Sequence, residues 1–359
     1  MRLAAIALVV LSIAADRAHA CGGGVVSSRA ATVGANVQRI FLVSSPTSTT
    51  VVTQVAVPAT TSDYGVLIPL PARPTIDPQP VPSAAFDELD AATAPRLVRG
   101  EPSSSGFSLG CGGGASKASG RSGPVIASPP VQIGPVTAVT LAADDGTAVN
   151  EWLAANGFAL PDEGRALVDA YAGPGHFFVA VKRSTSAADG APSSVGVRFT
   201  LPGDARTLPL RFARLGAAQT VAFTVFVAAD APAGPEPPFE GLVLTDLDPM
   251  VIDKEGYPAA VERAVAERKG RAFVIESARR RAALPGGNAL LAGLGATTTV
   301  TRISTIVQRE DLTGDASLAG LAPSPLPDSI SLPQRAAAGP ALLALGLVTL
   351  AARRRRPTS

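Results

Sequence analysis

Apolar and polar residues alternate along much of the chain, with the period of two that buries one face of a β-strand. Ten segments show this pattern, and most follow one another across short turns. Because strands joined by short turns pair antiparallel, the pattern predicts antiparallel sheets. The predicted strands are Val37–Val43, Thr49–Val57, Asp63–Leu70, Pro135–Leu141, His176–Ser184, Val195–Leu201, Leu208–Leu215, Gln219–Ala228, Arg271–Ser277 and Thr297–Val307.

Four segments have the spacing of apolar residues that is typical of helices, together with recognisable ends. Ser83 is a good N-cap for the first, Asp145 precedes the second, Pro161 precedes the third and Gly270 ends the fourth. The predicted helices are Ser83–Thr93, Gly146–Asn156, Asp162–Tyr171 and Pro258–Lys269. Runs of strands with a few inserted helices predict an α+β fold built mostly on antiparallel sheet.

The first twenty residues have the three parts of a secretory signal peptide. Arg2 gives a positive n-region, Leu3–Ala14 forms the apolar h-region, and Ala18–Ala20 is a small-x-small cleavage site. We therefore expect residues 1–20 to be removed on export, which leaves Cys21 at the new N-terminus. The alternative is a buried N-terminal helix, but charged residues directly after the apolar run favour a signal.

The C-terminal end carries a second apolar run, residues 336–352, which predicts a transmembrane helix. As a helix it spans about 25 Å, and basic residues at its end can snorkel to the edge of a bilayer core of about 30 Å. Its basic flank consists of Arg353, Arg354, Arg355 and Arg356. The positive-inside rule places this tail, residues 353–359, in the cytoplasm. The run also resembles the tails that sortase-like enzymes cleave, but the diagnostic residue before the helix, such as a cysteine, is missing. The alternative is a core helix with a disordered basic tail.

Between the two ends we expect one exported body, residues 21–320. It contains a Gly/Ser-rich loop at residues 100–124, and a Pro-rich segment at residues 321–335 predicts a stiff stalk. With 46% hydrophobic and 17% charged residues, the chain is neither fully disordered nor a polytopic membrane protein. The formal net charge is +2, and because the signal carries +1 and the tail arginines carry +4, the remainder carries −3. No basic face therefore favours nucleic acid.

Two cysteines are present, Cys21 and Cys111, and each begins a Cys-Gly-Gly-Gly string. In an oxidising compartment this pair predicts one disulfide, which would stabilise the fold by roughly 4 to 5 kcal/mol. The alternative is a lipidated Cys21 at the cleavage site and a free Cys111. Once His19 leaves with the signal, two cysteines and one histidine are too few for a zinc site, so no metal is expected.

Candidate catalytic groups are few. His176 is the only histidine left after the signal, and it follows a Gly-Pro-Gly turn at the start of a predicted strand. The acidic candidates are Asp87, Glu88, Asp90, Asp246, Asp248, Asp253, Asp311 and Asp315, and we expect them to lie on solvated surfaces. Glu276 and Lys182 occupy polar positions of predicted strands. The chain has no G-x-S-x-G, H-E-x-x-H, phosphate-binding loop or dinucleotide motif, so no cofactor is expected.

An ordered set of longer strings resembles the bacterial family called domain of unknown function 2330. These strings lie at residues 63–77, 86–98, 131–183, 206–227, 271–278 and 299–315. The resemblance covers most of residues 21–316 and includes the Cys-Gly-Gly start after the signal. The chain has no second cysteine soon after Cys21, so a short N-terminal disulfide has no counterpart here. The resemblance implies export and offers no activity.

Two classes of function fit these patterns. The first is a membrane-anchored, non-enzymatic module displayed in the periplasm or at the cell surface, where it binds an envelope protein or a surface polymer. The second is an envelope hydrolase or transferase that uses carboxylates or His176. The second class requires His176, an acid and a Ser or Thr to converge on one pocket. The absence of catalytic motifs favours the first class.

Overall fold

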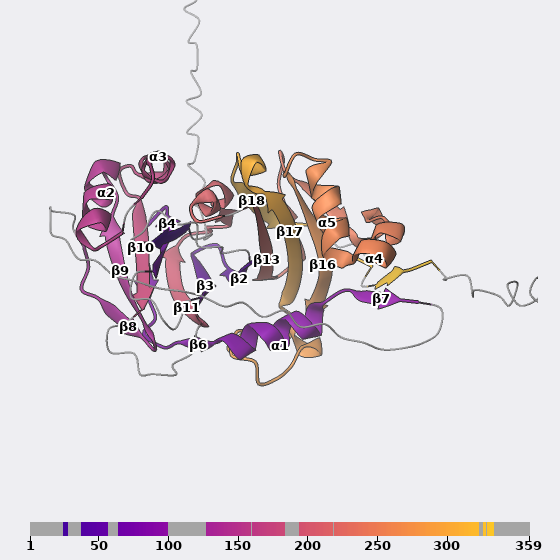
Figure 1. The fold of residues 1–359 in the computed structure, drawn as a ribbon. Helices are drawn as coiled ribbons and strands as arrows, with labels where there is room; N and C mark the ends of the chain where they lie inside the picture. The colour runs from indigo at the N-terminus through magenta and orange to yellow at the C-terminus, as the bar shows by residue number, and fades with distance from the viewer. Residues whose placement is uncertain are drawn as a thin grey trace, which may run out of the picture.

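A computed structural model gives the fold of the central part of the chain (Figure 1). The described residues are 24–27, 37–56, 64–99, 127–158, 160–183, 194–217, 219–322, 326–327 and 329–333. Several predicted features lie outside these residues. They are the signal peptide at residues 1–20, the Cys21–Cys111 disulfide, the loop at 100–124, the helix at 336–352 and the arginines at 353–356.

The largest sheet has nine strands and is the central layer of the fold. Its order is β15 (Glu240–Val243), β16 (Ala272–Arg280), β17 (Thr299–Gln308), β13 (Thr220–Ala229), β2 (Val37–Ser44), β3 (Ser48–Ala56), β11 (Ser194–Pro202) and β5 (Thr75–Ile76), with β6 (Val81–Pro82) also paired to β11. The β13–β2 and β15–β16 pairs are parallel, and the others are antiparallel.

A second sheet of five antiparallel strands packs against the first. Its order is β1 (Gly24–Ser27), β4 (Tyr64–Leu70), β10 (Phe177–Arg183), β9 (Val136–Ala142) and β8 (Val131–Ile133). Two small sheets complete the strand inventory of the described chain. One joins β12 (Thr207–Leu208), β18 (Ala316–Gly320) and β14 (Ala233–Pro235), and the other pairs β7 (Arg96–Val98) in parallel with β19 (Ser329–Ser331).

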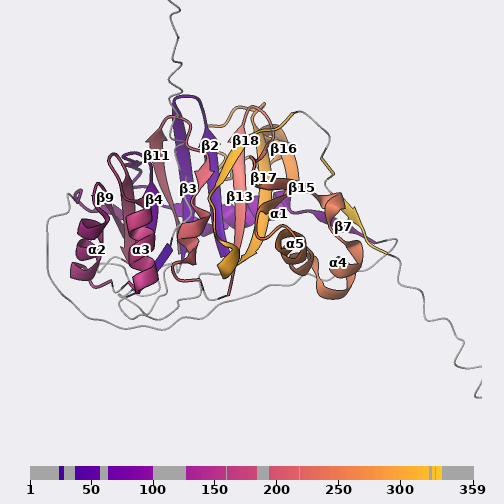
Figure 2. The ribbon, with the colours of Figure 1, turned by 90° about the horizontal axis from the view of Figure 1, so that it is seen from above.

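Short helices cover the sheets. The described α-helices are α1 (Ser83–Thr93), α2 (Gly146–Ala155), α3 (Asp162–Tyr171), α4 (Pro249–Glu255) and α5 (Tyr257–Ala266). Four short 3-10 helices are η1 (Leu210–Arg214), η2 (Leu244–Asp246), η3 (Arg281–Ala283) and η4 (Arg309–Asp311). Figure 2 shows α1 behind the large sheet, α5 in front of it, and α2 with α3 beside the smaller sheet.

Three apolar clusters hold these layers together. The main core contains Ile40 and Val225 of the nine-stranded sheet and Ile68 and Val179 of the five-stranded sheet, and it extends to buried residues of α4 and α5. A second cluster packs α2 and α3 on the other face of the five-stranded sheet. In the third, Phe86 of α1 packs on the opposite face of the nine-stranded sheet. The order is therefore helices, sheet, sheet, helix. Because both sheets are covered on both faces, several of their strands are apolar at successive positions.

Local signals account for the ends of the helices. Asp145 caps α2, since its Oδ1 accepts a hydrogen bond of 2.9 Å from the Thr147 amide, and Gly157 follows with a φ of 85°. The predicted cap of α1 differs. Ser83 is the first helical residue, and its hydroxyl donates to the Ser194 carbonyl on β11 at 2.7 Å. This hydroxyl therefore fastens the helix to the sheet.

The predicted α+β class with a transmembrane helix needs correction. The described chain is mainly β-structure, and its short helices only cover sheet faces. None of the helices in the described ranges has the length and apolar character to cross a bilayer. The longest, α1, has 11 residues, and this corresponds to about 16 Å, half of a bilayer core. The run at 336–352, for which we predicted such a helix, lies outside the described residues.

Two local predictions also differ from the structure. The segment Leu208–Leu215 forms the end of β12 and then η1, in which Leu210 and Ala213 are buried with a spacing of three. The segment 321–335, predicted as a stalk, contains β19, which pairs with β7. Ile330 and Leu332 are buried in the main core, so this part of the segment packs on the body.

Candidate functional site

The most unusual polar group in the described core is Glu276 on β16. Glu276 is only 1% exposed, although its side chain is a carboxylate. The pairing of β16 with β17 shifts here, because Ile275 lies opposite Ile303 while Ser277 lies opposite Arg302. Glu276 is therefore the extra residue of a β-bulge, and such a bulge redirects a side chain out of the regular alternation of the strand.

Three side chains contact the Glu276 carboxylate. The Tyr257 hydroxyl, at the start of α5, donates to Oε1 at 2.7 Å, and the Ser304 hydroxyl on β17 donates to the same oxygen. The Arg302 Nε donates to Oε2. A buried carboxylate costs several kcal/mol in lost hydration unless charge and hydrogen bonds compensate it. These three donors provide that compensation.

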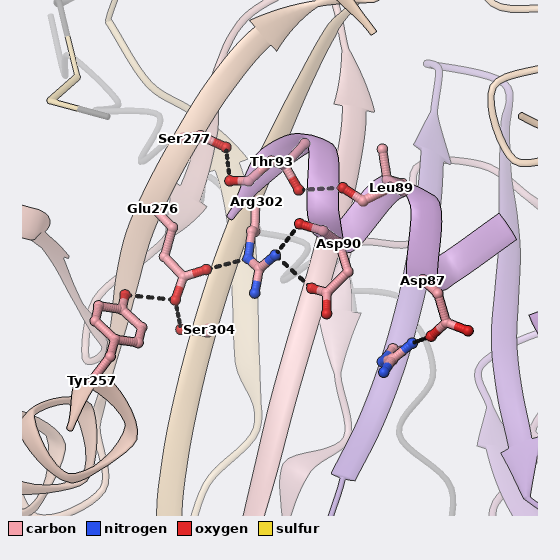
Figure 3. Close-up of polar contacts among 10 residues, drawn as sticks. Asp87, Leu89, Asp90, Thr93, Tyr257, Glu276, Ser277, Arg302 and Ser304 are labelled. Atoms are coloured by element: carbon pink, nitrogen blue, oxygen red, sulfur yellow. Dashed lines mark hydrogen bonds and ion pairs between the residues drawn. The ribbon is translucent and has the colours of Figure 1, made fainter. Parts of the chain in front are cut away.

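Arg302 extends the contacts from Glu276 to α1 (Figure 3). Its Nη1 forms an ion pair of 2.5 Å with Asp90 Oδ1 and donates a hydrogen bond of 2.9 Å to the Asp90 carbonyl. The guanidinium also lies over the Phe226 ring, with 5.8 Å between Cζ and the ring centroid. Tyr257, Glu276, Arg302, Ser304 and Asp90 together form what we call the central polar network.

Neighbouring contacts fix α1 in the same place. The Ser277 hydroxyl donates to the Thr93 carbonyl at 3.0 Å, at the last residue of the helix. One turn before Asp90, Asp87 forms an ion pair of 2.5 Å with Arg39 of β2. Both carboxylates therefore face arginines that project from the sheet. The central polar network thus fastens α1 and α5 to the nine-stranded sheet, and this is a structural role.

A second polar cluster joins α3 to the C-terminal part of the fold. Asp315 accepts hydrogen bonds from the Tyr171 hydroxyl at 2.7 and 2.8 Å. It also accepts from the Arg211 amide at 3.1 Å and pairs with the Arg211 Nη2 at 3.0 Å. The Arg211 guanidinium lies 5.0 Å from the centroid of the Tyr171 ring. Asp315 is therefore an internal acceptor with a structural role.

Both clusters contain a tyrosine with a raised pKa. Burial is the largest cause for Tyr171 and for Tyr257, followed by the negative charges of Asp315 and Glu276 respectively. In the unfolded chain each hydroxyl should titrate near the ordinary value of about 10. The unfolded state therefore loses these protons at a lower pH than the folded state.

We expect this difference to weaken the fold in alkaline solution. The stabilisation by the two neutral tyrosines is complete below pH of about 10, and above it the free energy of unfolding falls by about 1.4 kcal/mol per pH unit for each tyrosine. Urea unfolding of the full chain between pH 8 and 11 measures this slope. Tyr171→Phe and Tyr257→Phe should each make the slope shallower, and an unchanged slope in both variants would contradict the assignment.

His176 lies apart from both clusters. It precedes β10, where its amide donates to the Gly173 carbonyl at 2.9 Å and its carbonyl accepts from the Ala143 amide at 2.9 Å. Its Nδ1 is buried and has no hydrogen-bond partner among the described residues. The structure therefore does not bring His176 into a relay with a carboxylate and a hydroxyl of the described chain.

Most of the acidic candidates have structural contacts. Glu88 Oε2 accepts from Asn288, Asp246 Oδ2 accepts from the Val243 amide, and Asp248 caps α4. Asp253 pairs with Arg99. No structural role stands out for the Asp311 carboxylate. We expected these residues to lie on solvated surfaces, and this is only partly correct, because several of their carboxylates bind helices and turns. Among the described residues, no group of three or more His, Cys, Asp or Glu could hold a metal ion.

The central polar network was missed by sequence reasoning, although one signal was present. Phe273, Val274 and Ile275 are apolar at successive positions just before Glu276. Such a run indicates a strand that is buried on both faces, so a charged residue within it should be buried and paired. The partners come from β17, α5 and α1, and their proximity follows only from the fold.

Comparison with known families identifies the chain. The family described as "Uncharacterized protein conserved in bacteria (DUF2330)" matches residues 15–236. The chain belongs to this family. This confirms the resemblance found in the ordered strings. No curated protein and no solved structure matches the chain.

The DUF2330 match ends within the fold. Asp90 lies inside the matched residues, whereas Tyr257, Glu276, Arg302 and Ser304 lie beyond residue 236. The central polar network therefore connects the matched part of this DUF2330 protein with the part that follows it. Strands β15, β16 and β17 complete the sheet that the matched part begins.

Proposed function

We propose that this DUF2330 protein is an exported, non-enzymatic module that binds a protein or a surface polymer outside the cytoplasmic membrane. One observation carries the proposal. The buried or half-buried carboxylates Asp90, Glu276 and Asp315 are all occupied by donors that belong to the fold. A general acid or base must reach a substrate proton, and an occupied, enclosed carboxylate is poorly suited to that task.

The N-terminal sequence supports export. The signal pattern of residues 1–20 ends before Cys21, and the first described strand, β1, begins at Gly24. Cleavage after Ala20 would therefore leave β1 intact, and β1 pairs with β4 over all of its length. Removal of the signal is compatible with a complete five-stranded sheet.

The second candidate is a hydrolase or transferase that uses His176, and one observation favours it. The buried Nδ1 of His176 has no hydrogen-bond partner among the described residues, so its hydrogen-bonding capacity is unused there. Asp144 lies near His176, because its Oδ1 accepts a hydrogen bond of 3.2 Å from the amide of Gly175, the residue directly before His176. This candidate would require a hydroxyl or a water as the nucleophile.

Affinity capture from the native envelope separates the two candidates. The 359-residue chain, tagged after residue 359, is expressed with residues 1–20 present, as wild type and as His176→Ala. We expect both forms to be recovered without residues 1–20, as intact mass should show, and to retain the same partner. Turnover of an envelope substrate by the wild type that is lost in His176→Ala would overturn the proposal. Recovery with residues 1–20 still present would overturn export.

A further inference from the structure

Exposed large apolar side chains are rare on the described surface. They are Val37, Leu97, Val98 and Met250, with exposed fractions of 62%, 44%, 49% and 46%. Leu97 and Val98 belong to β7, and Met250 belongs to α4. Figures 1 and 2 both show β7 beside α4, at the end of the molecule opposite α2. Successive residues of a strand point to opposite faces, so Val98 faces away from Leu97. Leu97 shares its face with Arg99, which pairs with Asp253 of α4, and Leu97 and Met250 form what we call the apolar corner.

Specific contacts hold this corner in place. Arg99, directly after β7, pairs with Asp253 of α4. Met250 precedes Asp253 by three residues, so both side chains lie on the same side of the helix. On its other side β7 pairs with β19, with Leu97 opposite Ile330. Because strand pairing and an ion pair fix both elements, the apolar side chains are presented on a rigid surface.

The chain leads an apolar segment directly to this corner. The Leu332 amide donates to the Val98 carbonyl at 2.9 Å, and the last described residue is Pro333. The uncharged run at residues 336–352 begins three residues later. Three extended residues span about 10 Å, so the tether between Pro333 and this run is short.

A second segment also begins here, after Arg99, but its composition is different. Residues 100–124 are rich in Gly and Ser and offer little apolar surface, whereas residues 336–352 contain five leucines. In water, apolar surface is stabilised by burial, and a short tether gives the attached segment a high local concentration. The later segment is therefore the better match for the corner.

We propose that residues 336–352 pack against the apolar corner of their own chain when the protein is in water. Packing would cover Leu97 and Met250 and, at the same time, remove part of the apolar run from solvent. The described fold would thus carry a docking surface for its own C-terminal segment. This proposal does not depend on the proposed binding function, because it concerns a contact within the chain.

Site-specific photocrosslinking of the full chain tests this contact. The photoreactive residue p-benzoylphenylalanine replaces Met250 in one variant and Leu97 in a second, and both positions are exposed. After irradiation in detergent-free buffer, peptide mass spectrometry identifies the crosslinked partner. We expect peptides from residues 336–352 in both variants, and loss of this crosslink when Leu343 and Leu347 are changed to Ser.

Val37 provides the matched control, because it is apolar and exposed but lies at the start of β2. The probe at Val37 should give no crosslink to residues 336–352. Mixing isotopically heavy and light chains shows whether a crosslink joins two copies, since these carry one heavy and one light peptide. Crosslinks only between copies, only to residues 100–124, or absent from both variants would overturn the proposal.

Discussion

A chain that ends at residue 236, where the DUF2330 match stops, is expected not to fold. Every residue of β13 pairs with β17, from Thr220 opposite Gln308 to Ala229 opposite Thr299, and β17 lies beyond the cut. The cut also removes β16 with its buried Phe273. A large buried apolar side chain contributes about 1.5–3 kcal/mol. Because a domain is stable by only about 5–15 kcal/mol, the loss of β15, β16 and β17 is expected to exceed the free energy of unfolding.

A chain that ends at residue 333 is the matched control, because it keeps all of the described strands and helices. Thermal unfolding followed by near-ultraviolet circular dichroism measures both chains. We expect a cooperative transition for the longer chain and none for the shorter one. A cooperative transition of the shorter chain would show that the matched residues form an independent domain.

The sequence predicted those strands in which one face is buried or both faces are buried. The predicted Val37–Val43 and Val195–Leu201 correspond to β2 and β11, within one residue at each end. The helices Ser83–Thr93 and Asp162–Tyr171 were predicted with the observed bounds, because Pro and apolar spacing mark their limits. These elements depend on local chemistry, which a sequence displays directly.

The arrangement of the elements was not predictable in the same way. The parallel pairing of β2 with β13 joins segments far apart in the sequence, and no local pattern indicates it. Short strands such as β14 and β19 depend on their partners for their existence. The helix α4 was overlooked within an acidic segment, although Asp248 before Pro249 is a clear helix start.

The candidate site shows the same division. An acidic residue in a strand suggests a solvated face, and Glu276 was assigned in this way. A bulge and an arginine on the neighbouring strand turn it into a buried ion pair. The sequence predicted that His176 stands at a strand entrance, and it lies directly before β10. Only the fold shows that no described carboxylate accepts from or donates to its Nδ1.

Arg302→Met is expected to destabilise the protein by about 3–5 kcal/mol, because it leaves a buried carboxylate without its counter-charge. Glu276 is 1% exposed and loses the guanidinium, and Asp90 loses its ion pair. Chemical unfolding of the full chain measures this loss. Hydrogen exchange should show the earliest opening in α1, because Arg302 holds the Asp90 carbonyl of that helix.

Arg39→Met is a closely matched control, since Arg39 also projects from the large sheet and pairs with an aspartate of α1. The Asp87 side chain is 64% exposed, so this pair should contribute only about 0–1 kcal/mol. Similar losses in the two variants would contradict the special role of the central polar network. A large loss for Arg302→Met alone would show that burial, and not the number of ion pairs, decides the energy.

The double variant Arg302→Met with Glu276→Gln separates stranded charge from lost packing. Glutamine keeps the shape of Glu276 and can still accept from Tyr257, but it carries no charge. If the cost of Arg302→Met is mainly an uncompensated buried charge, the double variant should recover at least about 1 kcal/mol of it. If the two losses simply add, the arginine acts through its packing on Phe226 and its bond to α1. In that case Arg302 would stabilise the fold through these contacts and not by neutralising the charge of Glu276.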